Sequence, residues 1–85
     1  MHGVSLWETR KSGDLNIHFL ESLDDAIVMA KCLARAELEN AYENEILDKY
    51  EYRDELWNIK ENIVKEKKWS ADWSDLELEI LVPKD

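Results

Sequence analysis

The stretch that decides the fold is Asn44 to Asp54, NEILDKYEYRD. Apolar residues recur at helical spacing on both sides of it, from Leu23 to Ala41 and again from Tyr52 to Ile63. If the stretch is itself helical, the result is one kinked or straight helix of about 45 residues, roughly 68 Å long. Such a rod cannot bury its apolar stripe within a monomer of this size, so it would force dimerisation. If the stretch turns, the result is a helical hairpin.

We expect the hairpin, because this stretch is the most polar and least periodic part of the chain. Asn44, Asp48 and Asp54 could each cap a new helix. A clear helix start also precedes it at Ser22, whose side chain can accept hydrogen bonds from unpaired backbone amides. The sequence therefore predicts two helices between Ser22 and Lys68.

Two short strands are predicted before the helices, at Val4 to Arg10 and Leu15 to Leu20. Between them, Ser12-Gly13-Asp14 is typical of a tight turn, and together the three segments predict a β-hairpin. In the second strand apolar residues alternate with polar ones, the pattern of a half-buried strand. The apolar residues expected to share one face of it are Leu15, Ile17 and Phe19.

A third strand is predicted from Leu76 to Val82, where apolar and acidic residues alternate until Pro83. It could complete a small antiparallel sheet with the N-terminal hairpin, covered on one face by the helices. We therefore expect an α+β fold, in the order ββααβ, as one small acidic domain over residues 1–85. Trp69 and Trp73 lie on the connection into this strand, which is expected to be a helical turn or a folded loop.

The charge of the chain indicates its kind of partner. Twenty Asp and Glu stand against eleven Lys and Arg, a net of -9 on 85 residues. From Glu37 to Glu55 eight carboxylates are accompanied by only two cations, Lys49 and Arg53. Such a field repels nucleic acid and acidic membrane surfaces and attracts basic protein surfaces. We expect no direct nucleic-acid partner and no membrane partner.

Runs of like charge are often only the solvated face of a helix, so the acidic segment has a purely structural interpretation too. Its imbalance argues against that interpretation, because a solubilising helix normally mixes both signs. A 19-residue helical span is roughly 28 Å long. Phosphates on one DNA strand advance about 3.4 Å along the axis. The segment therefore carries negative charge at a density comparable to that of one DNA strand.

Candidate chemistry is sparse. His2, His18 and Cys32 lack the spacing of a zinc site, and two isolated glycines cannot form a phosphate-binding loop. Cys32 lies in an apolar-rich helical segment that is typical of an inert core thiol. No nucleophile–base constellation is present, so we expect no enzyme, no metal and no cofactor. The single cysteine and the absence of a signal peptide or a long apolar segment favour a cytoplasmic protein.

Aromatic residues are the remaining candidates. Trp57 adjoins the apolar stripe and is expected in the core. Trp69 and Trp73 could cover the core or anchor a partner. The tyrosines near the acidic segment could grip a basic partner, but Tyr50 and Tyr52 could equally pack at the helix bend. The candidate partner-binding residues are Glu37, Glu39, Tyr42, Glu43, Glu45, Asp48, Tyr50, Glu51, Tyr52, Asp54, Glu55, Trp69 and Trp73.

These features favour an inhibitory binding protein that places its acidic surface in the basic groove of a nucleic-acid-binding protein. In small size, acidity and lack of catalytic residues, the chain resembles the general profile of phage-encoded anti-restriction and anti-CRISPR proteins. One alternative is a structural protein that forms a homodimer through its helices. Another is an immunity protein or antitoxin against a basic nuclease.

Overall fold

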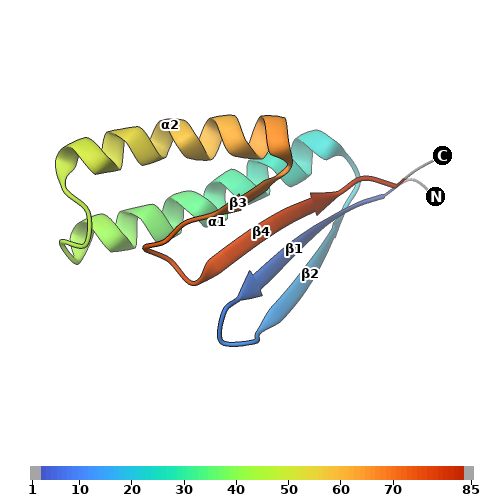
Figure 1. The fold of residues 1–85 in the computed structure, drawn as a ribbon. Coiled ribbons are helices and arrows are strands. Elements are labelled where there is room, and N and C mark those ends of the chain that lie inside the picture. Colours follow the sequence, from blue (N-terminus) through green and yellow to red (C-terminus); the bar gives the residue numbers. More distant parts are fainter. Residues whose placement is uncertain (1–2, 84–85) are drawn as a thin grey trace.

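A computed structural model of the protein describes residues 3–83, which form four strands and two helices in the order ββααββ. The elements are β1 (Val4–Arg10), β2 (Leu15–Leu20), α1 (Leu23–Glu43), α2 (Lys49–Glu66), β3 (Lys68–Ser70) and β4 (Leu76–Leu81). The strands form one antiparallel sheet with the order β2-β1-β4-β3, and both helices lie on the same face of it (Figure 1). The predicted α+β fold is confirmed, with one strand more than expected.

The chain turns between Asn44 and Asp48, so the predicted helical hairpin is confirmed and the single long helix is wrong. Asn44 closes α1 by donating its backbone N–H to the Asn40 carbonyl. Leu47 is buried within the turn and fixes it to the core. Asp48, one of the three expected caps, begins α2.

The core lies between the helices and the sheet face that they cover. The buried residues of α1 are Ala26, Ala30, Ala34, Leu38 and Ala41. Four of these five are alanine, and small side chains allow α1 to approach its neighbours closely. Larger side chains fill the remaining space, among them Leu6, Ile59, Ile63 and Leu76. The apolar stripes of both helices are thus buried within a single molecule.

The short strand β3 was not predicted, because its three residues follow α2 almost directly. Lys67 ends α2 in the left-handed conformation, with φ of 59°, and this reverses the chain at once. Trp69 then pairs with Leu78 of β4. The expectation of a helical turn or loop holds only for the segment between Ser70 and Leu76.

The side chains of Leu15, Ile17 and Phe19 in β2 lie on the opposite face of the sheet from the helices, whereas Leu20 packs against the core. The register pairs Ile17 with Trp7 and His18 with Leu6. Since Leu6 is buried against the helices, residues paired with its neighbours Ser5 and Trp7 face away from them. Leu15, Ile17 and Phe19 are accordingly exposed, so the expectation that they form a half-buried face is wrong. The reason is that they lie on the face of the sheet that neither helix covers (Figure 1).

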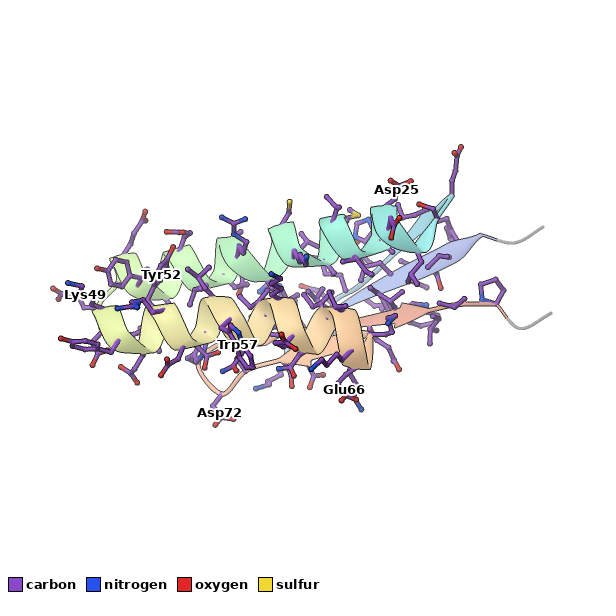
Figure 2. All side chains as sticks on the ribbon, turned by 90° about the horizontal axis from the view of Figure 1, so that it is seen from above. Asp25, Lys49, Tyr52, Trp57, Glu66 and Asp72 are labelled. Atoms are coloured by element: carbon purple, nitrogen blue, oxygen red, sulfur yellow. The ribbon has the colours of Figure 1, made fainter. Side chains whose placement is uncertain are left out.

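Trp57 was expected in the core and is instead 63% exposed. The apolar stripe of α2 faces α1 and the sheet through Ile59 and Ile63. One residue advances about 100° around a helix, so Trp57 does not share the face of its neighbour Leu56. Figure 2 shows Tyr52 on the side of α2 that faces α1 and Trp57 on the other side.

Candidate partner-binding surface at the helical hairpin

The turn of the hairpin brings the two halves of the acidic segment together at one end of the molecule. Residues 37–43 belong to the last turns of α1, and residues 49–55 to the first turns of α2. Figure 2 shows this end, marked by Lys49 and Tyr52, opposite the end marked by Asp25 and Glu66. We call residues 37–55 the acidic hairpin end.

Three exposed carboxylates of the acidic hairpin end have neither a salt bridge nor a side-chain hydrogen bond within residues 3–83. No Lys or Arg among residues 3–83 lies within salt-bridge distance of Glu43, Glu45 or Asp54. Glu43 occupies the last turn of α1, and that turn contains no basic residue. A helix C-terminus carries partial negative charge, so its dipole adds to the field of these side chains.

Glu39, Tyr42 and Tyr52 form a contact between the helices. The Tyr52 hydroxyl donates a hydrogen bond to the Glu39 carboxylate, and this bond raises the pKa of Tyr52. The rings of Tyr42 and Tyr52 lie 4.7 Å apart between centroids, tilted by 40°. Of the two interpretations of Tyr52, packing at the bend is therefore confirmed. Tyr42 is more exposed than Tyr52 and extends this contact to the surface.

Asp48 and Glu51 form the capping box that begins α2. The Glu51 N–H donates to Asp48 Oδ1 at 2.8 Å, and the Asp48 N–H donates to Glu51 Oε1 at 3.0 Å. Both side chains are exposed, and they contribute charge to the acidic hairpin end while they hold its helix in place. Replacing either one would disturb the fold as well as the charge.

Glu37 belongs to an ion network that the sequence could not reveal. Arg10 of β1 donates through Nη1 to Glu37 at 2.9 Å and to Asp75 at 2.8 Å. The Ser74 hydroxyl donates to the same Glu37 oxygen at 2.7 Å. These hydrogen bonds raise the pKa of Arg10 further above its ordinary value. Glu37 thus connects α1 with β1 and the segment before β4, and part of its charge is neutralised.

Besides Tyr42, two exposed large side chains lie among these charges, Ile46 and Tyr50. Tyr50, in the first turn of α2, is 71% exposed, as expected of a candidate anchor. Ile46, in the turn, is 56% exposed and was missed. Its neighbour Leu47 is buried, and only the turn geometry settles which of these two apolar side chains points out. Glu55 is half-buried.

Trp69 and Trp73 do not belong to the acidic hairpin end. Trp69 is 3% exposed and Trp73 is half-buried, and their rings meet edge to face with centroids 5.6 Å apart. Of the two interpretations of Trp69, the core position is confirmed. A residue that packs in the core cannot also anchor a partner at the surface, so Trp69 leaves the candidate set. Trp73 packs against the same core from the segment before β4.

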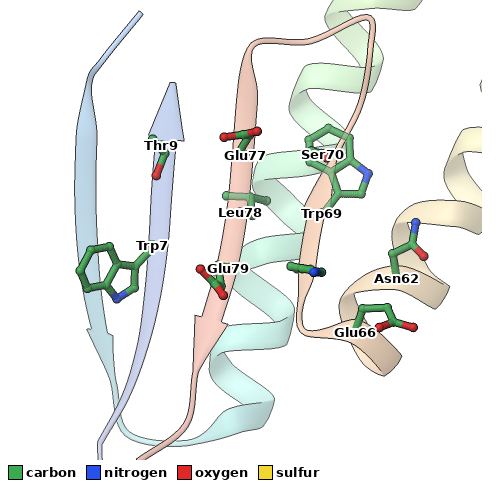
Figure 3. A pocket seen from close by; sticks show the side chains of 10 residues that line it. Trp7, Thr9, Asn62, Glu66, Trp69, Ser70, Glu77, Leu78 and Glu79 are labelled. Carbon is green, nitrogen blue, oxygen red and sulfur yellow. The ribbon is translucent and has the colours of Figure 1, made fainter. Parts of the chain in front are cut away.

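A separate cavity of about 500 Å³ lies beside β3 and β4 (Figure 3). Trp7 and Thr9 of β1 contribute to it, and α2 contributes Asn62 and Glu66. The cavity depends on β3, which explains why the sequence did not indicate it. Its lining includes three carboxylates and Lys68 but neither histidine nor cysteine, so it offers no nucleophile–base pair of the usual kind.

Two of the metal-ligand candidates, His18 and Cys32, lie on different elements, β2 and α1. His18 contacts Glu8 at 2.8 Å, and Cys32 is exposed on α1, which corrects the expectation of a core thiol. His2 lies outside the described residues. Within residues 3–83 no three or more His, Cys, Asp or Glu side chains gather in a metal-binding cluster. Neither helix of this part of the chain is long and apolar enough to cross a membrane.

Comparisons of the chain with protein-family models, with curated protein sequences and with solved structures find no match.

Proposed function

We propose that this protein is a non-enzymatic inhibitor whose acidic hairpin end docks into the basic groove of a nucleic-acid-binding protein. One observation carries the proposal. The fold joins two acidic segments at one end of the molecule and leaves Glu43, Glu45 and Asp54 exposed without cationic partners among residues 3–83. The inhibitor would occupy Lys and Arg side chains that otherwise bind phosphates.

The exposed side chains of Tyr50 and Ile46 suit such an interface. Electrostatic attraction steers a complex together, but affinity usually depends on a few buried anchors. Tyr50 can pack its ring against Arg or Lys side chains through a cation–π contact. Ile46 adds apolar area in the turn between the two acidic helix ends. An acidic rim around an apolar centre is the arrangement expected for a basic, partly apolar groove.

The position of Glu43 supports a binding function for the charge. A cation in the last turn of a helix stabilises it, and an anion there does the reverse. The last turn of α1 contains no basic residue and ends on Glu43, with Glu45 close behind. The Glu43 carboxylate therefore destabilises the end of α1 in the free protein. A cationic partner bound there would counteract this effect.

The test is an affinity capture from host lysate with matched baits. The acidic-end variant carries Glu43→Lys and Asp54→Lys. The control carries Glu21→Lys and Glu66→Lys, which change the net charge equally at the opposite end of the helices, where both side chains are exposed. We expect the wild type and the control to capture a basic nucleic-acid-binding protein at about 50 mM salt, and the acidic-end variant to lose it.

Bound protein should be released by about 500 mM salt or by added DNA or RNA, because counterions and phosphates compete for the same cations. Equal capture by the acidic-end variant, or capture that is unchanged over this range of salt, would contradict the proposal. If the captured protein is a nuclease encoded beside this chain, the inhibitor is an immunity protein or antitoxin. The same surface serves in either case.

Dimerisation through the helices has no support in the fold. The side chains that would form that interface, including Ala34, Leu38, Ile59 and Ile63, are buried within the single chain. A helical dimer would have to open this core.

A further inference from the structure

The two edges of the sheet differ in how they are protected. β3 forms one edge with only three residues, carries Lys68 and lies against α2. β2 forms the other edge with six residues, LNIHFL, which include no proline, no glycine and no Asp, Glu, Lys or Arg. Natural edge strands usually carry charges, proline or bulges that prevent pairing with another strand. β2 contains no charged residue and no proline, and its regular register with β1 excludes a bulge.

The backbone groups that β2 presents outward can be identified. Arg10 donates its N–H to the Asp14 carbonyl at 2.8 Å, so these two residues form a hydrogen-bonded pair. Such pairs alternate with non-hydrogen-bonded pairs along an antiparallel ladder. Residues 16, 18 and 20 therefore bond to β1. The N–H and C=O groups of Leu15, Ile17 and Phe19 point away from β1, toward the free edge.

The side chains of these same three residues are exposed on the open face of the sheet. Phe19 is 81% exposed, and Leu15 and Ile17 are also exposed. The neighbouring strands extend this face with Trp7, which is half-buried, and Leu81, which is exposed. The free edge of the sheet is therefore also its most apolar border.

We propose that β2 pairs with β2 of a second copy of this chain, antiparallel and with the two-fold axis at Ile17. In this register Leu15 lies opposite Phe19 of the second copy, and Ile17 lies opposite its own counterpart. All three are residues with outward backbone groups, so each pair exchanges two hydrogen bonds. Asn16 lies opposite His18 of the second copy on the other face. The interface uses the same edge of both copies and closes as a dimer.

The lack of charged residues in β2 favours pairing with another uncharged strand, such as β2 of a second copy, over a basic partner at this edge. The chain has a net charge of -9, yet β2 contains no Asp or Glu that could attract a cationic surface. A second copy can cover the strand without removing a carboxylate from water. β2 is the outermost strand, on the far side of β1 and β4 from β3 (Figure 1). Pairing there keeps the two acidic hairpin ends apart.

The first test is the molar mass by analytical ultracentrifugation over a range of concentrations. We expect the wild type to pass from 10.1 kDa to twice that mass as concentration rises. Ile17→Lys places two like charges opposite each other at the axis, and the variant should stay monomeric. Trp57→Lys changes an exposed apolar residue on α2, away from the proposed interface, and should still dimerise. A wild type that is monomeric at every concentration, or an Ile17→Lys variant that dimerises equally well, would overturn the proposal.

The second test fixes the register. Opposite Cα atoms of a hydrogen-bonded antiparallel pair lie about 5.5 Å apart, within the range that a disulfide spans. In a Cys32→Ser background, Ile17→Cys should therefore form a disulfide-linked dimer under mild oxidation. Asn16→Cys should cross-link far less, because in this register Asn16 lies opposite His18 of the second copy. Two cysteines at position 16 would therefore not face each other. Efficient cross-linking at position 16 but not at 17 would contradict this register. Both tests are independent of the acidic hairpin end, so either proposal can fail alone.

Discussion

At the scale of single residues, two tryptophans have opposite surroundings, Trp57 at the surface and Trp69 in the core. Trp69 is 3% exposed and packs in the core, whereas Trp57 is 63% exposed. Trp69→Ala should therefore cost about 3–5 kcal/mol of unfolding free energy. Trp57→Ala should change it by no more than about 0.5 kcal/mol. Urea denaturation followed by circular dichroism measures both, and equal effects would contradict the arrangement of α2.

Tyr52 gives a residue-scale prediction on pH. Its hydrogen bond to Glu39 raises its pKa above the ordinary value of 10.0. Because the folded-state pKa is the higher one, this contact stabilises the fold below about pH 10 and is lost as pH rises through the raised value. An absorbance titration of the phenolate should show a step above pH 10 that Tyr52→Phe removes. If the phenolate absorbance of the Tyr52→Phe variant above pH 10 follows the same curve as that of the wild type, the contact is excluded.

At the scale of elements, the start of α2 depends on Asp48. Its side chain accepts a hydrogen bond from the Glu51 N–H at 2.8 Å, and Glu51 returns one. Asp48→Ala should lower stability by about 0.5–2 kcal/mol. Asp54→Ala removes an equal charge from within the same helix and should cost at most about 0.5 kcal/mol. A comparison of urea midpoints tests this, and similar losses in the two variants would show that charge, not capping, governs this end.

One substitution at the end of α1 is expected to raise the stability of the protein and to weaken its binding to the partner. Glu43→Lys places a cation in a last turn that contains none, and should stabilise the protein by ~0.3–1 kcal/mol. The same change should weaken capture of the partner, because it reverses a charge at the centre of the acidic hairpin end. Thermal melting measures the first effect and affinity capture the second. A variant that melts lower, or that binds as well as the wild type, would argue against this account of Glu43.

The elements show what local sequence can predict. The sequence predicts β1 and β2 from alternation and turn residues, and it offers Asp48 as one of three possible caps. β3 has too few residues for a period to show. The register of β2 with β1 decides which face of the sheet carries Ile17. The pairing of Glu37 with Arg10 is a contact between segments distant in the chain. No pattern within one segment contains that information.

At the scale of the whole molecule, two surfaces of different chemistry occupy different places. The acidic hairpin end lies where the helices meet, and the apolar edge β2 lies at the outer border of the sheet (Figure 1). The first suits a cationic partner and the second an uncharged strand. A dimer through β2 would therefore present two acidic hairpin ends, each free to bind.

The most direct test of the central claim is the footprint of the captured partner, measured by hydrogen–deuterium exchange of this protein alone and in complex. We expect slower exchange in the complex over residues 43–55, which include the turn and the first turns of α2. The opposite end of the helices, around Glu21 and Glu66, should exchange as in the free protein. A complex in which residues 43–55 exchange unchanged while protection appears elsewhere would contradict the claim.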